Sequence, residues 1–176
     1  RKSGKNFAVM AHSSHPVEFS TDVSGQAVRR LIDSGAVVRC QAPLIKRVND
    51  HPDIWAALWR KQVALGAVPY YMFVERDTGP KNYFEVSLSR AYDIFSRAYN
   101  QVSGLARTVR WPSMSCTPVK VWVDGKLEFD EDGSWLQDVP IGDNDGAAPV
   151  ELPAPGAAGF AKHWITVCLL YTSPSP

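Results

Sequence analysis

Three short apolar runs, each followed by an amphipathic helical pattern, fill the first hundred residues and constrain the fold most. The clearest run is Tyr70–Val74, which lies between Pro69 and the turn signal Thr78-Gly79-Pro80. So short a run with breakers at both ends predicts a strand buried on both faces. It leads directly into three charged residues, Glu75, Arg76 and Asp77, which are expected at the carboxyl end of the strand.

The two other runs begin at Asn6 and Ala36 and also end in polar side chains. The first delivers His12-Ser-Ser-His15-Pro16, and the second ends at Arg39-Cys40-Gln41 before Pro43. Helical spacing follows each run, and the expected N-caps are Ser20 or Thr21, Asn49 or Asp50, and Ser87. Helix ends are expected at Gly35, Gly66 and Gly104.

This alternation predicts an α/β fold with three βα units over residues 1–104. Right-handed crossovers would make the strands parallel and bring their carboxyl ends to one edge of the sheet. The three side chains that we expect at this edge are His12, Gln41 and Glu75. Three units suit either an open sheet or an incomplete barrel.

The sequence changes character after Gly104. Residues 105–129 predict an extended segment and then a hairpin, Lys120–Phe129, around the Asp124-Gly125 turn. Residues 130–176 are acidic and then rich in Gly, Ala and Pro, which predicts a poorly structured, disordered tail. The chain has no initiating Met, and its last residues resemble a translated sequencing adaptor. We therefore expect a fragment of a longer reading frame with an end that is not biological.

Composition gives the class of protein. Among 176 residues, 45% are hydrophobic, and 19 Lys and Arg nearly balance 18 Asp and Glu. This balance gives no reason to expect nucleic acid or a membrane as partner, and no apolar run approaches the length of a membrane span. A cytoplasmic protein is expected. The cysteines, Cys40, Cys116 and Cys168, are scattered and suggest neither a disulfide framework nor a zinc site.

Several residues could carry chemistry, and each also has a structural interpretation. His12 and His15 could share a metal in a βα hydrolase, although their place at a strand end favours capping or ligand contacts. The amide of Gln41 must find a hydrogen-bond partner, either a ligand or a backbone group. Arg107 and Arg110, with Ser113 and Ser115 nearby, could hold a phosphate or carboxylate, or simply be solvated surface.

The order of motifs resembles the C-terminal half of the lysine 2,3-aminomutase family of radical S-adenosylmethionine enzymes, in its aminomutase-like branch. The resemblance covers about residues 6–125 and is most specific in Gln41-Ala-Pro-Leu-Ile-Lys-Arg-Val-Asn49-Asp50. The other matching strings are His12-Ser-Ser-His15-Pro16, Val68-Pro-Tyr-Tyr-Met-Phe-Val-Glu-Arg-Asp77 and Val102-Ser-Gly104-Leu-Ala.

The resemblance implies a partial (βα)6 barrel that binds S-adenosylmethionine, a [4Fe-4S] cluster and pyridoxal phosphate. In the family, a 5′-deoxyadenosyl radical starts the migration of an amino group from carbon 2 to carbon 3 of an amino acid. The cofactors supply this chemistry and the protein orients them. The residues that the resemblance places at S-adenosylmethionine are His12 and Gln41.

Three departures from the family pattern qualify this implication. The C-x-x-x-C-x-x-C cluster motif is absent, so the cluster ligands would lie outside this chain, which alone should be inactive. Cys116 precedes Thr117-Pro118 where the family has the Lys that binds pyridoxal phosphate, which leaves Lys120 as the candidate replacement. The two Asp that grip the substrate's distal ammonium correspond to Arg76 or Asp77 and to Arg110, which favours an anionic or neutral substrate.

Two alternatives stay open beside this enzyme class. The parent could be a paralogue that binds a metabolite or partner without aminomutase activity, or it could be the unrelated metal-dependent hydrolase. In each case we expect a small-molecule ligand, which for the aminomutase is an amino acid, and a homo-oligomer is compatible with every interpretation. The sequence does not name the substrate.

Overall fold

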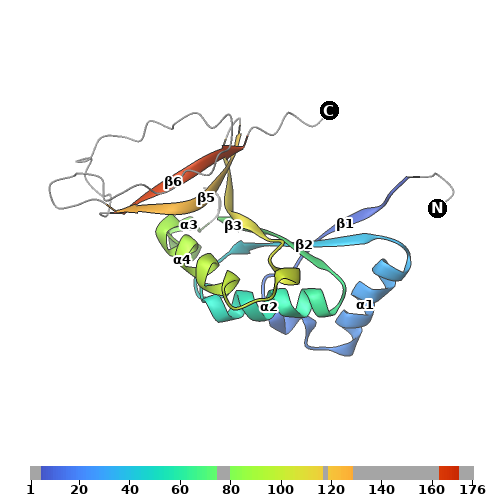
Figure 1. Ribbon diagram of the computed structural model, residues 1–176. Coiled ribbons are helices and arrows are strands. Elements are labelled where there is room, and N and C mark those ends of the chain that lie inside the picture. The colour runs from blue at the N-terminus through green and yellow to red at the C-terminus, as the bar shows by residue number, and fades with distance from the viewer. Residues whose placement is uncertain (1–4, 75–79, 117–118, 129–162, 171–176) are drawn as a thin grey trace.

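One six-stranded sheet forms the centre of the computed structural model, which describes residues 5–74, 80–116, 119–128 and 163–170. Its strands follow the chain order from β1 to β6 (Figure 1). The first four strands pair in parallel, and the last two pairs are antiparallel. The strands are β1 (Ala8–His12), β2 (Val37–Leu44), β3 (Val68–Val74), β4 (Arg110–Cys116), β5 (Val119–Glu128) and β6 (His163–Leu170).

Helices connect the parallel strands and lie together on one side of the sheet (Figure 1). This arrangement confirms the predicted α/β class and its parallel βα units, and it extends the parallel part to a fourth strand. The helices are η1 (Pro16–Phe19), α1 (Asp22–Asp33), α2 (Pro52–Ala64), α3 (Lys81–Phe84), α4 (Leu88–Tyr99) and η2 (Gly104–Ala106).

The helix boundaries follow local capping chemistry. Thr21 caps α1 and Ser87 caps α4, as predicted, because each side chain accepts a hydrogen bond from a backbone N–H of the first turn. The cap of α2 is His51, whose Nδ1 accepts from the N–H of Asp53 at 3.3 Å. The prediction of Asn49 or Asp50 as this cap is therefore wrong.

Packing of the helices against the sheet forms the core. Trp55 and Trp59 of α2 contact each other with ring centroids 5.8 Å apart, and Trp59 contacts Phe95 of α4 at 5.6 Å. These rings are fully buried against the inner face of β2 and β3. Burial of such large side chains is the main stabilising contribution to a domain of this size.

The face of the parallel strands that lies away from the helices remains accessible in the described part of the chain. We call it the open face. On β2, buried residues alternate with more exposed ones up to Leu44. On β3, Tyr70, Tyr71 and Phe73 are half-buried. The prediction that β3 is buried on both faces is therefore wrong, because the described helices form only one layer.

The strand limits differ from the prediction at Gln41. Strand β2 continues through Pro43 to Leu44, so Gln41 lies within the strand instead of at its end. Pro43 lies beyond the pairing of β2 with β1, which ends at Gln41, and its fixed φ suits extended backbone. Gln41 still lies beside the last residue of β1, which is His12.

The C-terminal strands also differ from the prediction. Asp124-Gly125 lies inside β5 at a register shift against β6 and does not form the turn of a hairpin. The antiparallel hairpin is instead β4 with β5. Strand β6, with the sequence HWITVCLL, lies within the range expected to be poorly structured. Its β-branched and aromatic residues suit strand pairing, which outweighs the composition of the segment around it.

Candidate functional site

Four side chains from consecutive parallel strands form a row across the open face. His12 of β1 pairs with Gln41 of β2, Gln41 pairs with Tyr71 of β3, and Tyr71 pairs with Arg110 of β4. Laterally paired residues point to the same face of a sheet. With strands about 4.8 Å apart, this polar row spans roughly 14 Å between its outer backbones.

The first two members of the polar row are in direct contact. The side-chain nitrogen of Gln41 lies 2.6 Å from Nε2 of His12, a hydrogen bond in which the amide donates when Nε2 carries no proton. The backbone pairing continues one residue further, since the N–H of Ser13 donates to the carbonyl of Gln41 at 3.2 Å. The predicted convergence of His12 and Gln41 is therefore confirmed.

The other two members are also in contact. Nη1 of Arg110 donates to the hydroxyl of Tyr71 at 3.2 Å. Burial and a hydrogen bond with Tyr70 raise the pKa of Tyr71 above its ordinary value, while the positive charge of Arg110 partly opposes the rise. Tyr71 thus presents a neutral phenol at neutral pH. No local pattern singles out Tyr71, because it lies inside an apolar run.

An irregularity in β3 adds Tyr70 to the same face. The pairing of β2 with β3 passes from Cys40 with Pro69 to Gln41 with Tyr71, so Tyr70 is the extra residue of a bulge. Neighbouring residues of a regular strand point to opposite faces, whereas a bulge turns them toward the same side. Accordingly, the rings of Tyr70 and Tyr71 meet edge to face with centroids 4.2 Å apart.

Asn49 binds the backbone segments that follow the first two members of the polar row. It is fully buried, and its Oδ1 accepts from the N–H of Ile45 at 2.6 Å. Its Nδ2 donates to the carbonyls of Ser14 and Pro43, both at 2.9 Å. These bonds tie the segment after β1 to the end of β2, and thus fix the positions from which His12 and Gln41 project.

Cys40 lies on the buried face of β2 and takes no part in the polar row. Burial raises the pKa of its thiol to about 11, although a hydrogen bond with Ser13 lowers it somewhat. Ser13 is itself buried and accepts a hydrogen bond from Gln62 of α2 at 2.8 Å. A thiol that remains protonated at neutral pH is a poor nucleophile and a poor metal ligand.

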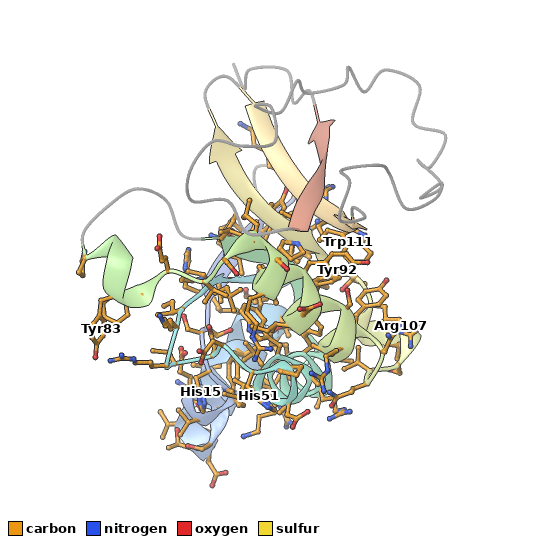
Figure 2. The ribbon with its side chains drawn as sticks, turned by 90° about the vertical axis from the view of Figure 1, so that its left-hand side faces the viewer. His15, His51, Tyr83, Tyr92, Arg107 and Trp111 are labelled. Atoms are coloured by element: carbon orange, nitrogen blue, oxygen red, sulfur yellow. The ribbon has the colours of Figure 1, made fainter. Side chains whose placement is uncertain are left out.

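Two pairings that the sequence left open do not form. His15 is the N-cap of η1, where its Nδ1 accepts from the N–H of Val17 at 3.2 Å, so it does not join His12. Arg107 donates through Nε to the carbonyls of Tyr99 and Val102 at the end of α4, on the helical side and away from Arg110. In Figure 2, His15 lies at the lower left of the helices and Arg107 at the right. Within the described ranges, no three His, Cys, Asp or Glu residues cluster as metal ligands.

The remaining predicted site residues can be placed only in part. Glu75, Arg76 and Asp77 lie outside the described residues. Lys120 lies in β5 opposite Ser115, and Cys116 is the last residue of β4, while their side chains are outside the described set. Also within the described residues, no helix has the length and apolar character needed to cross a bilayer.

Comparison with curated proteins finds similarity to proteins named lysine 2,3-aminomutase. The chain is 28% identical over 127 residues to a protein of Aquifex aeolicus described as "Putative L-lysine 2,3-aminomutase". It is 30% identical over 98 residues to an L-lysine 2,3-aminomutase of Methanococcus maripaludis. These alignments cover 72% and 56% of this chain. The chain is a distant homologue of such aminomutases.

The similarity also covers only part of the length of these relatives. The matched segments amount to 33% of the Aquifex protein and 22% of the Methanococcus protein, so the chain spans a third or less of these relatives. No family model matches the chain. The similarity therefore supports an aminomutase-like group of isomerases without selecting a member of it.

Proposed function

We propose that this chain is part of a radical S-adenosylmethionine enzyme of the aminomutase type, which moves an amino group between neighbouring carbons of an amino acid. The observation that carries the proposal is the hydrogen-bonded pair of His12 and Gln41 on consecutive parallel strands. These are the two residues for which the family resemblance implies contact with S-adenosylmethionine. The distant homology to proteins named lysine 2,3-aminomutase supports the same class.

The polar row has the dimensions and groups that such a site requires. At about 14 Å it is long enough for one ligand the size of a nucleoside-bearing cofactor to contact side chains from all four strands. His12 and Gln41 offer hydrogen-bonding groups at one end, and Tyr71 and Arg110 offer a phenol and a cation at the other. The extra residue Tyr70 adds a second aromatic ring beside Tyr71 on the same face.

The described residues suit S-adenosylmethionine better than they suit a [4Fe-4S] cluster. His12 and Gln41 suit the polar groups of S-adenosylmethionine, which when bound supplies the hydrogen-abstracting radical in enzymes of this class. Cys40 does not fit as a cluster ligand, because its thiol is buried and stays protonated. Since the sequence also lacks the C-x-x-x-C-x-x-C motif, the ligands of a [4Fe-4S] cluster would come from outside this chain.

Pyridoxal phosphate is the least supported cofactor. Cys116 stands where the family has its Lys, and a thiol cannot replace an amine in holding an aldehyde cofactor as an imine. Lys120, one residue past Val119 in β5, is the candidate replacement. Cys116 is also the observation that favours the second candidate function, a paralogue that binds a metabolite through the polar row without rearranging it.

Equilibrium dialysis with S-adenosylmethionine tests the proposal. His12→Ala and Gln41→Ala should each weaken binding about tenfold, the expected effect of losing a hydrogen bond to a charged or strongly polar ligand. Gln26→Ala on the exposed side of α1 is the matched control and should leave binding unchanged. Equal affinity in the three variants would contradict the assignment of the site.

The reading frame of the parent gene provides an independent test. If the chain belongs to this enzyme class, the upstream sequence should encode three cysteines in the C-x-x-x-C-x-x-C spacing. An upstream sequence without them would remove the radical-enzyme proposal, even if the polar row binds a nucleoside. The paralogue alternative would then be the better account of the chain.

A further inference from the structure

A buried amide on α2 lies on the helical side of the polar row. Gln62 is only 2% exposed, and its Oε1 has no hydrogen-bond partner among the described residues. Turning the amide round would leave its nitrogen unpaired instead, so either orientation leaves one buried polar atom unsatisfied. Such an atom lowers the stability of a fold. Leucine has a similar volume and no polar atom, so packing alone does not explain a glutamine here.

The other end of the amide is bound to the residue that follows His12. Nε2 of Gln62 donates to Oγ of Ser13 at 2.8 Å, and both side chains are buried. The N–H of Ser13 donates in turn to the carbonyl of Gln41 at 3.2 Å. Ser13 therefore joins the end of β1 to β2 through its backbone and to α2 through its side chain.

A second contact lies beside the first. Cys40 precedes Gln41 on β2, is buried on the helical side, and forms a hydrogen bond with Ser13. Successive side chains of a strand point to opposite faces. The pair of His12 and Gln41 on the open face is thus matched by the pair of Ser13 and Cys40 on the helical side, and Gln62 binds this second pair from α2.

The end of β1 depends on such contacts because β1 is the outermost strand and, among the described strands, pairs only with β2. Two other side chains also bind the segment after β1. Asn49 donates to the carbonyl of Ser14, and Lys61 donates to the carbonyl of Pro16. Both bonds hold backbone further along the chain, whereas Ser13 is directly bonded to His12. A rotation of Ser13 would therefore turn the imidazole on the open face.

We propose that Gln62 is a positioning residue, which acts through Ser13 to hold the imidazole of His12 against the amide of Gln41. The unpaired oxygen lowers stability, while the nitrogen of the same side chain pre-organises the pair for a ligand. That this ligand is S-adenosylmethionine rests on the proposed function. The positioning of His12 does not.

Three measurements on the variant Gln62→Leu test this inference. The urea midpoint of unfolding should stay equal or rise, because leucine removes the unpaired oxygen. In nitrogen NMR spectra at about pH 8, where an ordinary imidazole is neutral, His12 should change from the single tautomer selected by Gln41 toward a mixture of tautomers. In equilibrium dialysis, S-adenosylmethionine should bind about threefold more weakly or worse, because members of one hydrogen-bond network are coupled.

Two further chains provide controls. Ser96→Ala on α4 removes the other buried side-chain oxygen that lacks a partner among the described residues. It should keep or raise the urea midpoint and leave the His12 spectrum and ligand binding unchanged. In a Ser13→Ala chain, Gln62→Leu should cause no further change in the spectrum, because its effect passes through Ser13. Gln62→Met, which also lacks the amide, takes the place of Gln62→Leu if the leucine variant does not fold.

An unchanged His12 spectrum in a folded chain without the Gln62 amide would overturn the inference. Spectral changes of equal size in Ser96→Ala would also overturn it, because they would reflect a general loosening of the fold. The NMR readout needs no cofactor, so the two proposals fail separately. A spectrum that responds as expected in a chain that does not bind S-adenosylmethionine keeps the role of Gln62 and removes the proposed function. Binding without the spectral response removes only the role of Gln62.

Discussion

Replacement of Asn49 by Ala should destabilise the fold strongly. The side chain has no exposed surface and makes three hydrogen bonds to backbone groups of Ser14, Pro43 and Ile45. Alanine removes all three and cannot replace them. Water cannot easily reach the backbone groups left behind, because Asn49 is fully buried and its carbonyl accepts from the buried indole of Trp55 at 2.7 Å.

The magnitude follows from the hydrogen bonds. Each contributes about 1 kcal/mol net, and a buried group left without a partner costs about 1–3 kcal/mol. Asn49→Ala should therefore lower the free energy of unfolding by about 3–5 kcal/mol. This is a large part of the roughly 5–15 kcal/mol that is typical of a single domain.

Urea unfolding followed by tryptophan fluorescence measures this effect, since Trp55 lies at the site. Asn100→Ala is the matched control, because Asn100 is exposed at the C-cap of α4 and its replacement should cost no more than about 0.5 kcal/mol. A variant that has lost its cooperative transition agrees with the upper end of the expected range. Equal unfolding free energies for the two variants would refute the role given to Asn49.

Four further predictions concern the backbone and the titrating groups. Gly66 has a φ of +84°, and an added Cβ would lie 3.1 Å from an isoleucine side chain of α1. Gly66→Ala should therefore lower the free energy of unfolding, measured by thermal unfolding, by about 1 kcal/mol or more. Gly104→Ala should not, because there is open space around Gly104. Cys40 should resist alkylation at pH 8 until the chain unfolds, since burial raises the pKa of its thiol to about 11. The thiol of Cys40 holds its proton to a higher pH in the folded chain than in the unfolded chain. Its contribution to the free energy of unfolding is therefore complete below pH 9 and falls as the pH rises from 9 toward 11. Urea unfolding at several pH values across that range measures this fall. In an ultraviolet pH titration, the burial-raised pKa of Tyr71 should delay its ionisation relative to an exposed tyrosine, and normal titration would contradict the burial of its hydroxyl.

The features that the sequence predicts correctly are those that depend on local pattern. The caps at Thr21 and Ser87, the parallel βα order and the meeting of His12 with Gln41 all follow from residue type and spacing. The cap of α2 is mispredicted because Asn49 is a strong capping residue by type. In this fold its side chain satisfies three distant backbone groups, a tertiary requirement that outweighs capping preference.

The candidate site is predicted only in part because its lateral arrangement depends on strand register. Gln41 and Arg110 stand out as polar residues in the sequence, but their alignment through Tyr71 requires the pairing of three strands. Tyr70 escapes prediction for the same reason, since no local pattern reveals a bulge in a parallel strand. Asp124-Gly125 illustrates the opposite error, because pairing with β6 overrides a strong turn signal.

The bulge at Tyr70 makes the chemistry of the open face depend on the number of residues in β3 as well as on their identity. Loss of one residue before Tyr71 would restore a regular ladder and remove the edge-to-face contact between the rings of Tyr70 and Tyr71. Homologues that differ by one residue in the length of β3 should therefore differ in which side chains face the open side. Comparisons of such proteins should therefore first establish the number of residues in β3 and then compare the side chains.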